Sequence, residues 1–265
     1  MRWLFFVSIQ CLFACGHGEL DQKIREASDK IAKDPGNPEL LLARAVLHQS
    51  HRDPKAAHAD FLSATKCRPA HPPAFLQLAR FQRKQGSRKA ALATIQKYFS
   101  VLETESSSPM AYRERALLAP PKVALEDWSR YLENKKTPTM TDFEEAGRAA
   151  LAAKNSKIAR SFLLDGLKNF PKSIPLHHLH CRLALMDKDS QAARNSFKTL
   201  ELLYPSLLVK LRYEESVIWN DFDYPHLAKD AQKSALEAFE KLPLRFRKNS
   251  DLLEIYKTLS TSLAQ

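Results

Sequence analysis

Apolar residues recur along this chain at spacings of three and four over long stretches, and short polar segments containing proline separate these stretches. Side chains at such spacings share one face of a helix. The stretches are rich in Ala, Leu, Lys, Glu, Gln and Arg, which favour helix, and glycine is scarce, with 6 residues. Amphipathic stripes also lie near both ends: Leu20, Ile24, Ala27 and Ile31, then Leu252, Ile255, Tyr256 and Leu259. The pattern predicts an all-α chain.

A longer regularity is a period of 34 residues. It is kept by small residues (Ala45, Ala79, Gly147, Cys181), by alanines (Ala57, Ala91, Ala159, Ala193), by large apolar residues (Phe61, Ile95, Leu163, Phe197) and by prolines (Pro35 and Pro69, Pro171 and Pro205). Small residues let two antiparallel helices approach closely, while the large residue fills the space beside them. Proline marks the helix boundaries, because it has no N–H for a mid-helix hydrogen bond. The period therefore predicts repeated helix pairs, which must stack to bury their apolar faces.

These columns resemble the tetratricopeptide repeat (TPR), whose pattern of aromatic, small, alanine, aromatic and proline residues they match. The resemblance implies an all-α, right-handed superhelical solenoid of antiparallel helix pairs, with about five repeats over residues 38–207. We expect a leading cap helix over residues 19–37, and a degenerate repeat with a cap helix over residues 208–265. Terminal repeats are expected to be atypical because their outer faces meet water.

One repeat, from Pro109 to Asn134, departs from the pattern. Ala116 and Ala124 are only eight residues apart, and Pro120-Pro121 shortens the turn between them. Three serines at residues 106–108 lengthen the preceding loop. The two changes cancel, so the phase is recovered by Gly147.

The N-terminal segment has the layout of a secretory signal, in which Arg2 precedes about a dozen mostly apolar residues. This run is shorter than the roughly 20 apolar residues that span a membrane. The sequence Leu12-Phe13-Ala14-Cys15 resembles the bacterial lipobox. The resemblance implies a signal peptide over residues 1–14, a lipid on Cys15 and a short tether over residues 15–18. Ordinary cleavage after Gly16 and a buried N-terminal helix remain open as alternatives.

The lipobox resemblance also predicts where the protein resides. The chain would be exported and lipid-anchored in the cell envelope, since several acyl chains hold a protein firmly to a bilayer. Gly16 follows the cysteine, in the place of the aspartate that resembles an inner-membrane retention signal. In a cell with two membranes we therefore expect the outer membrane, with the protein facing the periplasm.

Basic residues concentrate at positions that the TPR resemblance places on the concave surface, where the first helix of each pair lines the usual peptide-binding groove. The position after the small column is held by Val46, Arg80, Leu117, Arg148 and Arg182, and Arg83, Lys84 and Arg113 lie nearby, against Glu39 and Glu144. The predicted partner-binding residues are Arg80, Arg83, Lys84, Arg113, Arg148 and Arg182. Arginine pairs bidentately with carboxylates, so we expect a protein partner with an acidic or extended segment. The alternative is that these cations only solvate the surface.

Composition bears on the remaining functional classes. The net charge is +11, which makes anionic partners plausible. A nucleic acid is not the partner we expect, and no cofactor is predicted. The cluster of His177, His178, His180 and Cys181 is interpreted as core residues, because His177, His180 and Cys181 occupy packing columns and no nearby acidic residue completes a metal site. Cys67 and Cys181 are predicted to be buried, inert thiols.

No motif of a hydrolase, metalloprotease or nucleotide-binding enzyme is present, so the chain is predicted not to be an enzyme. The leading hypothesis is an envelope-anchored scaffold or assembly factor that mediates protein–protein interaction through a basic groove. The alternative is an exported carrier or adaptor whose basic surface binds anionic polymers or lipid headgroups.

Overall fold

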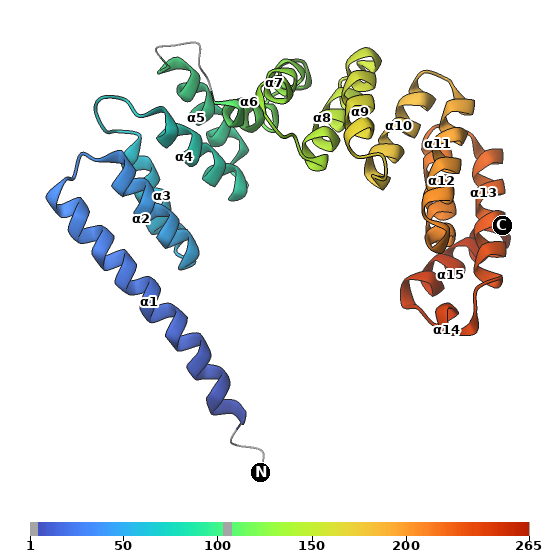
Figure 1. Ribbon diagram of the computed structural model, residues 1–265, viewed down its shortest axis with the longest axis horizontal. Helices are drawn as coiled ribbons and strands as arrows, with labels where there is room; N and C mark the ends of the chain where they lie inside the picture. Colours follow the sequence, from blue (N-terminus) through green and yellow to red (C-terminus); the bar gives the residue numbers. More distant parts are fainter. Residues whose placement is uncertain (1–4, 103–107, 265) are drawn as a thin grey trace. The chain divides into compact units, whose positions relative to one another are not determined.

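The computed structural model describes residues 5–102 and 108–264, with the side chains of residues 18–102 and 108–263 (Figure 1). All regular structure in these residues is helical, and they form two compact units, residues 1–135 and 136–265. The first unit contains α1 (Phe5–Lys33), α2 (Pro38–Ser50), α3 (Pro54–Ala64), α4 (Pro72–Lys84), α5 (Arg88–Ser100), α6 (Pro109–Ala116) and α7 (Pro121–Asn134). The second contains α8 (Met140–Ala152), α9 (Ser156–Asn169), α10 (Ile174–Met186), α11 (Ser190–Leu203), the 3₁₀ turn η1 (Pro205–Leu207), α12 (Leu208–Asp221), α13 (Pro225–Glu240), α14 (Leu244–Arg247) and α15 (Ser250–Ala264).

Both units are built from antiparallel helix pairs. In the N-terminal unit α2 packs on α3, α4 on α5 and α6 on α7, and α1 packs on α2. In the C-terminal unit α8 packs on α9, α10 on α11 and α12 on α13, and α15 covers α13. Successive pairs also touch, through α3 and α4, α5 and α6, α9 and α10, and α11 and α12. The predicted all-α solenoid of helix pairs with capping helices is confirmed.

The predicted packing columns are buried. Ala45, Ala57, Ala91, Ala159, Cys181 and Ala193 are fully inaccessible, and Phe61, Ile95, Leu163 and Phe197 are nearly or fully so. Side chains from different columns pack together in the same buried cluster. One such cluster contains Ala45, Ala57 and Phe61 together with Leu78. The small residues therefore stand where two helices come closest, as the 34-residue period indicated.

Four of the turns within helix pairs share one backbone conformation. Arg52, Gly86, Lys154 and Lys188 have positive φ values between 54° and 78°, and they follow the 34-residue period. Each turn closes with the two hydrogen bonds of a Schellman motif, such as Asn155 N–H to Ala150 O at 3.0 Å and Lys154 N–H to Leu151 O at 2.9 Å. The next residue begins the second helix, and in Asp53, Asn155 and Asp189 its side chain accepts a backbone N–H bond from that helix.

A lysine at positive φ is strained, because its Cβ crowds the backbone in a conformation that glycine adopts freely. Lys154→Gly is therefore expected to stabilise the protein by about 0.5–1 kcal/mol. Thermal or urea unfolding of the variant and the wild type measures this change. The matched control is Lys198→Gly in the exposed face of α11, where glycine should cost about 1 kcal/mol. Equal destabilisation by both substitutions would contradict the assigned turn geometry.

The pair of α6 and α7 departs from this turn for a physical reason. The period would place a positive φ at residue 120, where Pro120 has a φ of −60°, as its ring requires. α6 ends early, at Ala116. Equivalent positions of its two helices, Ala116 and Ala124, are therefore 8 residues apart, four fewer than the 12 between Ala45 and Ala57. Because four residues are about one helical turn, the same faces of the two helices still meet.

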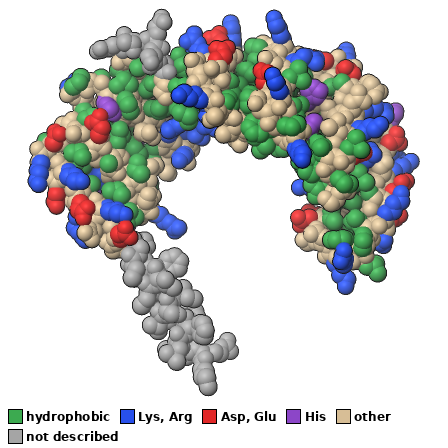
Figure 2. All heavy atoms as spheres, in the orientation of Figure 1, with side chains coloured by type: hydrophobic (Ala, Val, Ile, Leu, Met, Phe, Trp, Pro, Cys, Tyr) green, Lys and Arg blue, Asp and Glu red, His purple; other side chains and the backbone are tan. Residues whose placement is uncertain are grey.

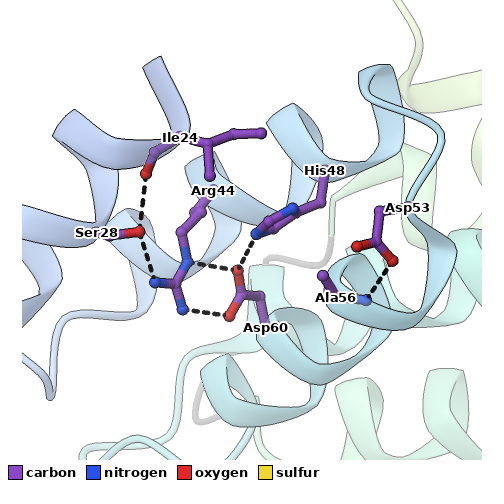
Figure 3. Close-up of polar contacts among 7 residues, drawn as sticks. All are labelled: Ile24, Ser28, Arg44, His48, Asp53, Ala56 and Asp60. Carbon is purple, nitrogen blue, oxygen red and sulfur yellow. Dashed lines mark hydrogen bonds and ion pairs between the residues drawn. The ribbon is translucent and has the colours of Figure 1, made fainter. Parts of the chain in front are cut away.

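The leading helix is fixed to the first pair by a polar network (Figure 3). Arg44 donates from Nε and Nη2 to the two carboxylate oxygens of Asp60, at 2.8 and 2.7 Å, and from Nη1 to Ser28 Oγ of α1 at 3.0 Å. Asp60 is buried, and His48 lies 3.8 Å from its second oxygen. One arginine thus joins α1, α2 and α3.

α1 begins at Phe5, whereas the sequence predicted a cap helix over residues 19–37. The predicted signal peptide, residues 1–14, and the predicted lipid site, Cys15, lie outside the residues whose side chains the structure describes. Both stay predictions. Among the described residues, no helix combines the length and the apolar character needed to cross a membrane.

Candidate partner-binding groove

The N-terminal unit contains a cavity of about 270 Å³ that brings together four of the six predicted cations. Its walls come mainly from α4 and α6, the first helices of two successive pairs. The lining residues are Gln49, Phe61, Gln77, Arg80, Phe81, Arg83, Lys84, Arg113 and Glu114. We call this cavity the basic groove. Of the described residues that line it, four are cations and one is a carboxylate.

Glu114 is the central fixed charge of the basic groove. Its side chain is 1% exposed, and it accepts a hydrogen bond from Arg83 Nε. Arg80 Nε lies 3.7 Å from the other carboxylate oxygen. Burial makes an unpaired carboxylate costly, so Glu114 holds these guanidinium groups in place. Glu114 is shared by two arginines, Arg80 and Arg83, and Lys84 adds a further positive charge to the lining, so the groove keeps a positive field.

Glu114 was not among the predicted groove residues, and Leu117 was predicted to face the groove in the same repeat. Leu117 does not line the cavity. α6 has 8 residues and ends at Ala116, so Leu117 follows the helix, and its carbonyl accepts a bond from Arg88 Nη1 at 3.1 Å. The groove face of α6 carries Arg113 and Glu114 instead. α6 begins 37 residues after α4, so Glu114 stands at the helix position of Gln77, which also lines the cavity.

The other two predicted cations, Arg148 and Arg182, line a separate hollow of about 570 Å³ in the C-terminal unit. Arg148 Nη2 donates to Glu144 Oε1 at 2.8 Å, and Arg182 Nη2 donates to Asp221 Oδ2 at 2.7 Å. The remaining walls include Ile174, Pro175, His178, Leu179, Tyr213, Glu214, Val217 and Ile218. Each arginine in this hollow thus has a carboxylate partner of its own.

His178 is the one ring in this hollow whose titration is strongly perturbed. Burial lowers its pKa to about 4, and Arg182, His177 and Lys210 act in the same direction. The imidazole is therefore neutral at pH 7, and its approach to Glu214, 3.5 Å from Nε2 to Oε2, is not an ion pair. Burial also raises the pKa of Glu214. In the described part of the chain, Nε2 of His178 is the buried side-chain polar atom without a hydrogen-bond partner.

The neighbouring residues of the His/Cys cluster have separate partners. His177 Nε2 bonds to the carbonyl of Pro171 at 2.9 Å, and His180 Nδ1 to Ser196 Oγ at 2.9 Å. Burial raises the pKa of the Cys181 thiol to about 12, so its reactive thiolate is suppressed. Within residues whose side chains are described, no group of three or more His, Cys, Asp or Glu is arranged to hold a metal ion.

Comparison with known proteins bears on the fold. Neither a protein-family model nor a curated protein sequence matches the chain. Among solved structures, the C-terminal part of a TPR repeat-containing protein from Cytophaga hutchinsonii aligns with a TM-score of 0.61 and 15% identity, over 92% of this chain and 96% of that chain. PilW, described as a widely conserved type IV pilus biogenesis factor, aligns with a TM-score of 0.56 and 16% identity, over 82% and 97%.

A third match is YrrB, described as a TPR protein with an unusual peptide-binding site, with a TM-score of 0.51 and 14% identity over 68% of this chain and 93% of that chain. Identities this low establish shared architecture and nothing finer. Together with the helix pairs and their 34-residue columns, these matches show that the chain has the fold of a TPR solenoid.

Proposed function

We propose that this protein is a non-catalytic scaffold whose N-terminal unit binds an acidic segment of a partner protein in the basic groove. The observation that carries the proposal is the convergence of Arg80, Arg83, Lys84 and Arg113 on one cavity around a single buried carboxylate. Arginine and lysine bind carboxylates through charge-assisted hydrogen bonds, which are about twice as strong as neutral ones. Glu114 pre-positions the arginines, so less side-chain entropy is lost when a ligand binds.

The residues that line the groove suit an extended segment. Gln49 and Gln77 also line the cavity, and their amides can donate to or accept from a peptide backbone. The buried rings of Phe61 and Phe81 lie behind the cations in the wall of the cavity. The TPR fold of the described chain supports a protein-interaction role in general, and YrrB, with the same architecture, is described as having a peptide-binding site.

Envelope anchoring is the second part of the proposal. It is supported by the apolar leader and by the resemblance of Leu12-Phe13-Ala14-Cys15 to a lipobox. A lipid on Cys15 would hold the scaffold at a membrane. In a cell with two membranes, the expected site is the outer membrane, with the protein facing the periplasm. PilW is described as a pilus biogenesis factor, and an anchored scaffold of this architecture is suited to assembling envelope proteins.

The groove is tested with the double variant Arg80→Gln/Lys84→Gln, which leaves the Arg83–Glu114 contact in place. The probe is a fluorescently labelled peptide of alternating glutamate and serine, measured by fluorescence anisotropy. We expect the affinity to fall at least tenfold, because a charge-assisted hydrogen bond contributes about 1.5 kcal/mol or more. The same variants are then used to capture partners from solubilised envelope.

The matched control is Lys55→Gln/Lys89→Gln, which removes the same formal charge from exposed positions of the same unit. It should leave the affinity within about twofold of the wild type, since exposed charges outside the groove act only through a screened field. Equal losses from both pairs would contradict the proposal. They would favour the alternative, a surface that binds anionic polymers regardless of sequence, whose affinity falls steeply with salt.

A further inference from the structure

The loop that joins α13 to α15 carries apolar side chains into solvent. Leu244 is 74% exposed and Phe246 is 48% exposed, and both belong to the short helix α14. Exposed Leu207 and Phe246 line one cavity of about 470 Å³, together with Val209, Leu242, Pro243, Leu252 and Ile255. We call residues 241–248 the apolar tip. Two large apolar side chains exposed on one four-residue helix are a candidate interaction site.

The apolar tip is held in this conformation by its own backbone contacts. Arg247 Nε donates to the carbonyl of Leu242 at 2.7 Å, and Arg247 Nη2 donates to the carbonyl of Glu240. These bonds satisfy acceptors at the C-terminal end of α13, and Pro243 fixes the entry to α14 with a φ of −57°. Leu244 and Phe246 are thus presented to solvent by a constrained turn.

Cations flank these apolar side chains. Lys241, Arg245, Arg247 and Lys248 fall within eight residues, with Glu240 and Asp251 as the nearest acidic residues in sequence. Lys241, Arg245 and Lys248 form no ion pair with any described residue. The guanidinium carbon of Arg245 lies 4.7 Å from the centre of the Phe246 ring, so a cation and an apolar ring share one surface. Figure 2 shows Lys and Arg side chains beside hydrophobic ones at the end of the C-terminal unit where Figure 1 labels α14.

We infer that the apolar tip docks on the surface of a lipid bilayer that contains anionic phospholipid. Leu244 and Phe246 would enter the boundary between headgroups and acyl chains, where aromatic and aliphatic side chains gain by leaving water. Lys241, Arg245 and Lys248 would stay at headgroup depth, because their long stems let the charge remain in water. The surface potential of anionic lipid attracts such cations.

Charge complementarity favours a bilayer over a second copy of the chain. In a two-fold symmetric contact the same patch faces itself, so four cations would meet four cations, and like charges in apposition are unfavourable. An anionic bilayer can bind both parts of the surface, since its acyl chains accept the apolar side chains and its headgroups attract the cations. This inference concerns the C-terminal unit and is independent of the proposed peptide groove.

The test places an environment-sensitive nitrobenzoxadiazole (NBD) label on the apolar tip of the full chain. Cys11→Ser and Cys15→Ser remove leader thiols and any acylation, while Cys67 and Cys181 are buried. Leu244→Cys carries the label, and the matched control is Leu164→Cys, at an apolar position of the same unit that is 49% exposed. Vesicles contain phosphatidylcholine alone or phosphatidylcholine with phosphatidylglycerol. We expect a blue shift and increased emission at residue 244 with phosphatidylglycerol vesicles, and no change at residue 164.

Three outcomes would overturn the inference. These are no spectral change at residue 244 when vesicles are present, equal changes at residues 244 and 164, and a concentration-dependent blue shift without lipid, which would assign the tip to a contact between copies. A second measurement tests the charges. Lys241→Gln/Arg245→Gln/Lys248→Gln should lower the vesicle partition coefficient reported by the residue-244 label at least tenfold, since each cation near anionic lipid contributes about fivefold. A partition coefficient within about twofold of the wild type would also overturn it.

Discussion

Replacing Arg115 with methionine is expected to lower the free energy of unfolding of the N-terminal unit by about 3–5 kcal/mol. The reason lies in Asp127, whose carboxylate is 1% exposed. Arg115 donates to both of its oxygens, from Nε and Nη2, each at 2.7 Å. Methionine matches much of the volume of arginine but donates no hydrogen bond. Asp127 would be left as a buried charge without its partner, which costs far more than the intact pair contributes.

Urea unfolding followed by circular dichroism measures this loss, and two further variants test its cause. Arg115→Met/Asp127→Leu removes both charges and should recover most of the stability, because replacing a buried ion pair by apolar side chains is often neutral. Lys122→Met, at an exposed position of α7, should change the stability by less than about 0.5 kcal/mol. If the double variant were as unstable as Arg115→Met, lost packing of the arginine stem would explain the effect, and the buried-charge explanation would fail.

The Arg115–Asp127 pair belongs to a position that recurs between the two helices of several pairs. In each case one residue precedes the small column and the other precedes the large apolar column. The position holds Arg44 and Asp60 in the first pair and His180 and Ser196 in the fifth, each 16 residues apart. Arg115 and Asp127 are 12 apart, because the turn through Pro120 is shorter by one helical turn. The shortened pair therefore keeps the same register of helix faces.

Much of the fold could be predicted because the packing positions recur with a fixed period and the helices that pack on each other are close in sequence. Ala57, Ala91, Ala159 and Ala193 occupy equivalent buried sites, so one helical hairpin predicts the next. The turn geometry was harder to predict from the sequence, since Arg52 and Lys154 adopt positive φ although their residue types rarely do so. The N-cap residues Asp53, Asn155 and Asp189 followed the same period and were the available signal.

The site was predicted less completely, because position on a helix does not determine which partner a long side chain finds. Arg80 and Arg83 reach the buried Glu114, whereas Arg148 pairs within its own helix with Glu144 and Arg182 reaches Asp221. Residue types alone cannot distinguish these outcomes, since arginine pairs with whichever carboxylate lies within reach. The apolar tip was missed for a similar reason. Its apolar residues would equally suit burial, and only the constrained turn shows that Leu244 and Phe246 face solvent.

Gly166→Ala is expected to lower the free energy of unfolding of the C-terminal unit by about 2–3 kcal/mol, although alanine favours helix over glycine by about 1 kcal/mol. A Cβ on Gly166 would lie 2.9 Å from Phe143 Cβ and 3.1 Å from Leu176 Cδ1. The Cβ of Phe143 is attached directly to the backbone of α8, so the clash is relieved only if α8 and α9 separate. Their separation would loosen the core around Phe143 and Leu163, which are buried.

Two other glycines make this prediction specific. A Cβ on Gly147 would meet Leu163 Cδ2 at 2.6 Å, the end of a flexible side chain, so Gly147→Ala should cost about 1 kcal/mol less than Gly166→Ala. A Cβ on Gly18 would meet nothing within 4 Å, and Gly18→Ala should be neutral or slightly stabilising. Thermal and urea unfolding of the three variants give the order of their free energies of unfolding directly. If Gly166→Ala were as stable as the wild type, the helix propensity of alanine would outweigh the close approach of α8 and α9, and the absence of a side chain at residue 166 would not be what sets the spacing of the pair.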